Sequence, residues 1–303
     1  MLTNLNPKMY KLLLVLLSTF LLSCLNKQRE AKNVGPKVDS TTEIIEVPKD
    51  LKEISGISFL NDSVVAAVED ENGILYFFDL YKKKIIREFS FAEDGDYEDL
   101  ARKGKDMYVV RADGVIYKIA NFEDEHPQIS YYETPLKSKN DIEGLAYDDK
   151  NDRLLLSVKE KNLSKTDKED IAKNIYQFTL KDMKFHSEPA IRISLKDIEK
   201  QFKGDNLMEA SKHFLKAAGN DNLNEVIKQS ALTYHPKSGK LYVLSSINKF
   251  ILILNEDGSF FKVVRFKGKE FIQPEGIAFN SKGELYISNE GKSKKGNIVK
   301  LIE

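Results

Sequence analysis

Short runs of apolar residues, separated by polar turns, recur from about residue 42 to the end of the chain. Runs such as VVAAV from Val64, LLLSV from Leu154 and LYVLS from Leu241 have the length and the β-branched content of strands. The hairpin dipeptides Asn72-Gly73 and Asp113-Gly114 separate two pairs of such runs. The pattern predicts many short antiparallel strands, and therefore an all-β fold.

An internal repeat organises these strands. Five segments align without gaps: ISGISF, YEDLA, IEGLAY, QSALTY and PEGIAF. Their second residues are separated by 43, 45, 87 and 45 residues along the chain; they are Ser55, Glu98, Glu143, Ser230 and Glu275. A period near 45 residues is typical of a four-stranded β-propeller blade.

Each segment is followed by a polar turn, a second strand, another turn and a third strand. Fourth strands are predicted at 84–91, 128–135 and 261–266. The last repeat ends after its third strand, whereas a spare strand, Thr42–Val47, precedes the first repeat. We therefore predict that this strand completes the last blade and closes the ring, which removes free sheet edges.

The spacing of 87 residues leaves the number of blades open. Residues 195–226 carry apolar positions at helical spacing, and Gly219 is a typical helix stop. We predict a five-bladed β-propeller with a small helical insertion at about 195–226. The alternative is six blades, with two of them inside the long gap.

The N-terminal segment has a different character. Lys8 and Lys11 precede an apolar run, Leu12–Leu22, that is too short to cross a bilayer and is typical of a signal peptide. The run ends at Leu21-Leu22-Ser23-Cys24, which resembles a bacterial lipoprotein signal and contains the only Cys of the chain. We predict a signal peptide at 1–24, lipidation at Cys24, a flexible tether at 25–41 and the propeller at 42–303. An ordinary secretory signal with an incidental Cys is the alternative.

Composition narrows the function. The chain has 303 residues, with 47 basic and 47 acidic ones, and this balance argues against a nucleic-acid binder. A single Cys excludes an intrachain disulfide and a zinc or iron–sulfur cluster built on cysteines. The four His residues lack metal-ligand spacing, and neither a nucleophile elbow nor a phosphate-binding loop is present in the sequence.

Candidate chemistry gathers at one mouth of the predicted channel. The first strand of each blade lines the channel, and the start of this strand lies at the same face as the end of the second strand. The five repeat residues Ser55, Glu98, Glu143, Ser230 and Glu275 therefore surround one mouth. The ends of the second strands are predicted to join them there: Glu69, Asp70, Arg111, Lys159, Glu160, Ser245, Asn289 and Glu290.

Three carboxylates in one narrow ring repel each other. Glu98, Glu143 and Glu275 should therefore raise each other's pKa values or be neutralised by a cation. Arg111 and Lys159 supply part of that positive charge. A set of oxygen donors suits a hard cation, so we predict a Ca²⁺ site formed by these three Glu residues. The alternative is that they cap neighbouring backbone amides.

The five repeat segments, together with Leu285–Gly291 (LYISNEG), resemble the SdiA-regulated family of bacterial envelope proteins. The resemblance extends from about residue 45 to residue 303. It implies a β-propeller in the cell envelope, without a settled biochemical activity. The family is similar to phytase-like and NHL-type propellers, some of which bind calcium at the channel. The chain departs from the family at Asp99, which stands where the family has Gly.

Two classes of function follow from this pattern. The first is a monomeric, membrane-anchored, extracytoplasmic propeller that binds a small ligand or an envelope protein, with Ca²⁺ at the mouth. The second is a metal-dependent hydrolase of phosphoesters, as in phytases, or of other esters. A phytase-like site needs several metals and a cluster of cationic side chains. The mouth offers only Arg111, Lys159 and Lys161, so we favour binding and assign no catalytic residue.

Overall fold

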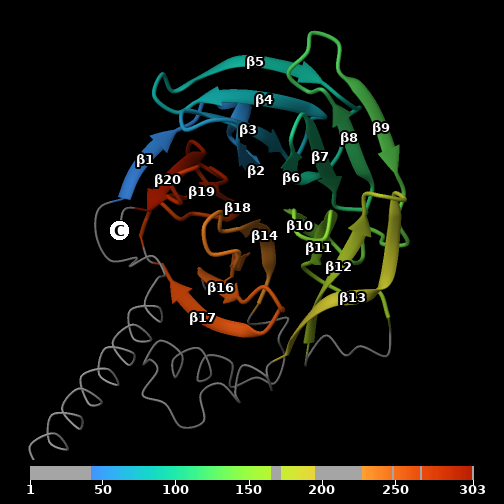
Figure 1. The fold of residues 1–303 in the computed structure, drawn as a ribbon. Helices are drawn as coiled ribbons and strands as arrows, with labels where there is room; N and C mark the ends of the chain where they lie inside the picture. Colours follow the sequence, from blue (N-terminus) through green and yellow to red (C-terminus); the bar gives the residue numbers. More distant parts are fainter. Residues whose placement is uncertain (1–41, 165–171, 195–226, 248, 267, 302–303) are drawn as a thin grey trace, which may run out of the picture. The chain divides into compact units, whose positions relative to one another are not determined.

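Five four-stranded antiparallel sheets make up the part of the chain that the structure describes. The computed structural model describes residues 42–164, 172–194, 227–247, 249–266 and 268–301. Figure 1 shows the sheets arranged around a common axis, as the blades of a β-propeller. The predicted all-β, five-bladed propeller is confirmed, and the six-bladed alternative is wrong.

The first two blades are built from consecutive strands, ordered from the channel outward. Blade 1 contains β2 (Ile54–Phe59), β3 (Val64–Glu69), β4 (Ile74–Asp79) and β5 (Lys84–Ser90). Blade 2 contains β6 (Tyr97–Lys103), β7 (Asp106–Arg111), β8 (Ile116–Ala120) and β9 (Gln128–Tyr132).

The other three blades follow the same order, except that the last takes its outer strand from the start of the domain. Blade 3 contains β10 (Ile142–Asp148), β11 (Arg153–Val158), β12 (Ala172–Thr179) and β13 (Lys184–Ser194). Blade 4 contains β14 (Gln229–Tyr234), β15 (Leu241–Ser245), β16 (Phe250–Leu254) and β17 (Phe260–Arg265). Blade 5 contains β18 (Pro274–Phe279), β19 (Leu285–Asn289), β20 (Asn297–Leu301) and β1 (Thr42–Glu46).

The ring closes through both its inner and its outer strands. Each inner strand contacts the inner strands of the two neighbouring blades, in the cyclic order β2, β6, β10, β14, β18. The antiparallel pairing of β1 with β20 runs from Thr42 opposite Leu301 to Glu46 opposite Asn297. The predicted closure by the strand before the first repeat is therefore confirmed.

The hydrophobic core lies between the blades rather than at the axis. Five clusters of buried residues occupy the five interfaces between neighbouring blades. At the interface of blades 3 and 4, for example, Leu155 and Ile175 pack with Leu232, Val243 and Leu252. Because strands alternate their side chains between two faces, each blade contributes apolar residues to both of its neighbours.

Several sequence predictions fall outside the described residues: the signal peptide at 1–24, the tether at 25–41 and the helical insertion at about 195–226. Within the described part of the chain, the one helical element is the short 3₁₀ turn η1 (Lys49–Leu51). The described residues accordingly contain no helix with the length and apolar character needed to cross a membrane.

Candidate functional site

A β-bulge occurs at the start of every inner strand, at the five residues that the repeat singled out. The pairing register between the first and second strands shifts in each blade: between Ile54 and Ile57, Tyr97 and Asp99, Ile142 and Gly144, Gln229 and Ala231, and Pro274 and Gly276. A bulge leaves a residue without a ladder partner and re-aims its side chain. The repeated bulge therefore explains why one position per blade can carry the site.

Carboxyl groups converge at this end of the channel. One oxygen each of Glu98, Asp141 and Glu143 lie within 4.8 Å of one another. The side chains of Glu143 and Glu275 are buried, with residue exposures of 4% and 7%. Among the described residues, Glu143 Oε2 and Glu275 Oε2 have no hydrogen-bond partner. Buried oxygens without a donor are costly, so this mouth favours a proton or a cation.

The protonation of these carboxyls is strongly perturbed. Burial, together with the nearby Glu143, raises the pKa of Glu98 to about 11. Burial and the charge of Glu275 raise the pKa of Glu143 well above its usual range. Burial also raises the pKa of Glu275, although Lys159 opposes the shift. Burial and mutual repulsion therefore disfavour the ionised form of these carboxyls, and a further positive charge would favour it.

Lys159 is the cation that the structure brings to this group. Its ammonium forms an ion pair with Glu143 Oε1, and its backbone amide donates to the Asp141 carbonyl at 2.7 Å. Burial lowers the pKa of Lys159, but Glu143 and Glu275 outweigh that effect and raise it. The buried Lys173 donates to the carbonyls of Lys159 and Glu160 and so fixes the end of β11.

Arg111 does not join the carboxyl group. Its guanidinium forms two parallel hydrogen bonds to Asp113, Nε to Oδ1 and Nη2 to Oδ2, both at 2.9 Å. It also donates to the Tyr117 hydroxyl at 3.1 Å. Because this bidentate pair is strong and fixed in geometry, it holds the Arg111 guanidinium against its own hairpin. Of these two residues, Lys159 therefore carries the neutralising role that the sequence assigned to both.

The remaining predicted residues of the mouth mostly serve the backbone. Glu69 Oε1 accepts a hydrogen bond from the Asn72 amide at 2.7 Å and caps the turn after β3. The hydroxyl of Ser230 donates a hydrogen bond to the Pro274 carbonyl. The hydroxyl of Ser245 donates to the Ile247 carbonyl. The side-chain amide of Asn289 donates to Asn297 Oδ1. The Ser55 carbonyl accepts a hydrogen bond from Ser288 Oγ at 2.6 Å.

A second acidic group lies where blades 1 and 5 meet. Burial, followed by the charge of Glu53, raises the pKa of Asp70 to about 6. Burial and a hydrogen bond with Glu53 raise the pKa of Glu290 to about 7. Gln273 donates a hydrogen bond to Glu290 Oε2. In blade 3, Glu160 forms an ion pair with Lys228 instead.

Sequence reasoning missed a second polar position of the repeat. The residues two places before the bulge are Glu53, Asp96, Asp141, Lys228 and Gln273. Each of them interacts with a residue of the mouth. The interaction is a hydrogen bond, an ion pair, or an electrostatic effect on the pKa of the mouth residue. The alignment of the five segments contained this signal, because every member is polar at the same register.

Asp99 occupies the channel itself. The other blades have Gly56, Gly144, Ala231 and Gly276 at its position. Its carboxylate is buried and accepts hydrogen bonds from the amides of Leu100 at 2.8 Å, Leu145 at 2.7 Å and Leu232 at 3.5 Å. A Cβ atom at Gly56 would lie 2.4 Å from Asp99 Oδ1, so glycine makes room for it.

Comparison with known proteins supplies the family. The SdiA-regulated family model matches residues 37–292. The chain belongs to the SdiA-regulated family. No curated protein matches this SdiA-regulated chain.

Solved structures share the fold of this SdiA-regulated protein at low sequence identity. Glutaminyl cyclase from Myxococcus xanthus is 12% identical, with a TM-score of 0.52, over 86% of this chain and 97% of the other. A luciferin-regenerating enzyme is 12% identical, with a TM-score of 0.50, over 87% and 96%. Virginiamycin B lyase from Staphylococcus aureus is 14% identical, with a TM-score of 0.43, over 82% and 67%. The first two similarities, with TM-scores of 0.52 and 0.50, show a common fold alone.

Proposed function

We propose that this SdiA-regulated protein is a lipid-anchored, extracytoplasmic propeller of the bacterial cell envelope that binds Ca²⁺ at its acidic mouth. Through this mouth it binds a small ligand or an envelope protein. One observation carries the proposal: carboxyl oxygens of Glu98, Asp141 and Glu143 lie within 4.8 Å of one another. The anchor rests on Cys24 and the apolar run before it.

Electrostatics supports a cation at this place. Ionised carboxylates that are buried together need positive charge, and the ion pair of Lys159 with Glu143 supplies one such charge. The oxygens of Glu143 and Glu275 that lack a hydrogen-bond partner among the described residues are available as further ligands. A divalent ion would favour the ionised form of these groups, against the effect of their burial.

The donor set favours calcium over zinc. Glu98, Asp141 and Glu143 offer only carboxylate oxygen, which hard cations prefer, whereas zinc sites in proteins are rich in nitrogen and sulfur ligands. Glu98 belongs to β6, and Glu143 belongs to β10. An ion held by both would therefore connect blades 2 and 3 and stabilise the folded ring.

The cationic side chains support binding rather than hydrolysis. A phosphoester hydrolase needs free positive groups that stabilise the transferred phosphate. Arg111 is engaged by Asp113, and Lys228 is engaged by Glu160. Lys159 is engaged by Glu143. The mouth thus has acidic groups for a cation, whereas Arg111, Lys159 and Lys228 are already paired.

The test is the thermal stability of the full-length chain, purified in detergent. Added Ca²⁺ should raise the melting temperature and a chelator should reverse it, because an ion that binds only the folded state stabilises it by about 2.7 kcal/mol at a hundredfold excess over its Kd. Glu143→Gln should blunt the response, whereas Glu125→Gln, in an exposed loop, should not. Zn²⁺ should substitute poorly. A melting temperature that ignores both Ca²⁺ and chelator contradicts the metal site.

A further inference from the structure

The end of the channel opposite the acidic mouth holds a second cavity. It has a volume of about 280 Å³ and is lined by the last residues of the five inner strands: Ile57–Phe59, Leu100–Arg102, Leu145–Tyr147, Leu232–Tyr234 and Ile277–Phe279. Its rim residues are equivalent in the repeat: Phe59, Arg102, Tyr147, Tyr234 and Phe279. Asp99 precedes these residues along β6, so its carboxylate lies between this cavity and the acidic mouth.

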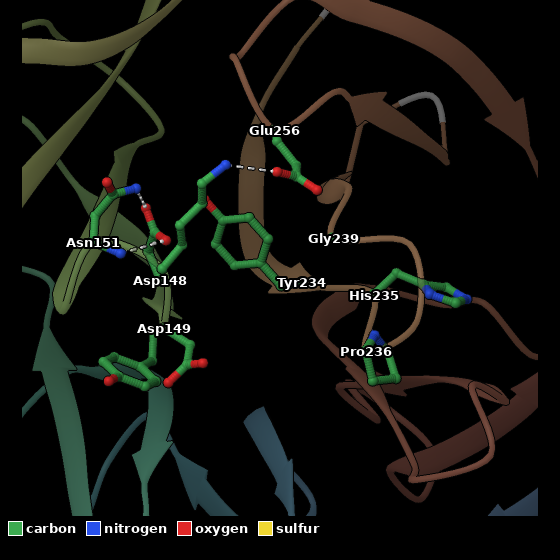
Figure 2. Close-up of a pocket in the computed structure, with 10 residues that line it drawn as sticks. Asp148, Asp149, Asn151, Tyr234, His235, Pro236, Gly239 and Glu256 are labelled. Atoms are coloured by element: carbon green, nitrogen blue, oxygen red, sulfur yellow. Dashed lines mark hydrogen bonds and ion pairs between the residues drawn. The ribbon is translucent and has the colours of Figure 1, made fainter.

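A cleft between blades 3 and 4 adjoins this cavity (Figure 2). The cleft has a volume of about 300 Å³ and is formed by the ends of β10 and β14 with the turns that follow them, and by Glu256 in the turn after β16. Tyr147 and Tyr234 line both the cleft and the channel cavity. The two spaces therefore share two aromatic walls, and together they suit an extended ligand.

Most charged side chains of the cleft are already paired within the protein. Lys150 and Glu256 form an ion pair at 2.9 Å that joins the turns of the two blades. Asp148 Oδ2 accepts hydrogen bonds from Arg153 Nε and Asn151 Nδ2, both at 2.8 Å. The cleft is therefore close to neutral, with the exposed Asp149 as an additional acceptor.

Gly239 lets the carboxylate of Glu256 approach the cleft. Its φ is +64°, which favours glycine, and a Cβ atom there would lie 2.6 Å from Glu256 Oε1. Figure 2 shows Glu256 and Gly239 on one side of the cleft and Asp148 and Asn151 on the other, with Tyr234 between them. Hydrogen-bonding groups thus flank an aromatic ring from both blades.

This combination selects one ligand chemistry. An anion would meet the carboxylates of Asp148, Asp149 and Glu256, and a hydrocarbon would bury the exposed Asp149 carboxylate and the Lys150–Glu256 ion pair away from water. A polyhydroxylated ring has an apolar face that packs on tyrosine and hydroxyl groups that donate to carboxylates. We infer that the two adjoining cavities bind a neutral oligosaccharide, with one part of the sugar chain against Tyr234 in the cleft and the next at the channel rim.

The test measures binding of chitohexaose, cellohexaose and maltohexaose to the full-length chain in detergent, by calorimetry. At least one of these sugars should bind. Asp149→Ala and Glu256→Ala should each lower the affinity for that sugar roughly tenfold, as expected for the loss of a hydrogen bond to a charged group. Tyr234→Ala should abolish binding, and Tyr234→Phe should retain it, which separates the ring from the hydroxyl. The control is Glu88→Ala, an exposed carboxylate on β5.

Three outcomes would overturn the inference. The first is the absence of binding by all three sugars to a chain that melts cooperatively. The second is a bound sugar whose affinity is unchanged in both Asp149→Ala and Glu256→Ala. The sugar should bind equally well with added Ca²⁺ and with chelator, so failure of the Ca²⁺ site and failure of this site are distinguishable. Spermine serves as a cationic probe, and binding of spermine in place of sugar at the same residues also refutes the inference.

Discussion

Replacing Asp99 by alanine removes the carboxylate from the middle of the channel. The amides of Leu100 and Leu145, which donate to it at 2.8 and 2.7 Å, then lose their acceptor, whereas the Leu232 contact at 3.5 Å is too long to contribute much. A buried donor without a partner costs about 1–3 kcal/mol. These amides belong to residues that line the 280 Å³ cavity, so water can reach them and the lower part of that range applies.

The expected loss for Asp99→Ala is therefore about 2–3 kcal/mol in the free energy of unfolding. For a domain of this size it corresponds to a fall of roughly 5–10 °C in melting temperature. Asp99→Asn keeps one acceptor oxygen and should lose about half as much. The exposed Asp94→Ala is the matched control and should leave stability unchanged.

Urea unfolding between pH 5 and pH 8 tests the argument. Burial raises the pKa of Asp99, so the folded chain binds this proton more tightly than the unfolded chain does. The advantage of Asp99 over alanine should therefore shrink as pH rises above the ordinary value of 3.8. The reasoning is refuted if Asp99→Ala is as stable as Asp94→Ala at pH 5, because desolvation of the carboxyl would then outweigh its hydrogen bonds.

Three further predictions concern other parts of the chain. Burial and Glu53 raise the pKa of Glu290 from 4.5 to about 7, so its ionisation should cost stability as pH rises between these values, and Glu290→Gln should flatten that part of a urea-unfolding profile. Ile45→Asp places a charge in the blade 5–blade 1 interface and should lower the free energy of unfolding by about 3 kcal/mol or more, whereas Ile44→Asp, at a position 46% exposed, should change it little. Cys24→Ala should release the protein from membrane fractions; a variant that stays bound after a salt wash would show that the anchor assignment is wrong.

Much of the fold was predictable because the repeat fixes the strand register. The five bulge positions and the closing role of Thr42–Glu46 follow from the aligned segments and from the incomplete last repeat. The outer strand of blade 3, β13, was missed. Its pairing with β12 jumps from His186 opposite Gln177 to Ile191 opposite Ile175, so Ser187–Ala190 do not follow the ladder. Pro189 in this stretch has no amide proton to donate to a ladder. Because proline is atypical of strands for this reason, the sequence did not indicate a strand here.

The candidate site was predictable in position but not in its pairings. Repeat geometry identifies Glu98, Glu143 and Glu275, since equivalent residues share one end of the ring. It does not say which cation each carboxylate meets. Arg111 turns to Asp113, two residues away in its own hairpin, whereas Lys159 extends to Glu143 across the first strand pair of its blade. Side-chain competition of this kind depends on local distances that spacing does not encode.

The pairing of β1 with β20 sets the order of events during folding. The partners Thr42 and Leu301 lie at opposite ends of the domain sequence. The first strand to be synthesised therefore has no pairing partner until the last strand has been made. Every earlier blade can form its own hairpins, but the ring has an open seam until β20 arrives. Because contacts this distant in sequence form slowly, ring closure should be the late step of folding. A chain that stops before β20 leaves β1 without its partner and the outer edge of β19 unpaired, and such edges invite aggregation.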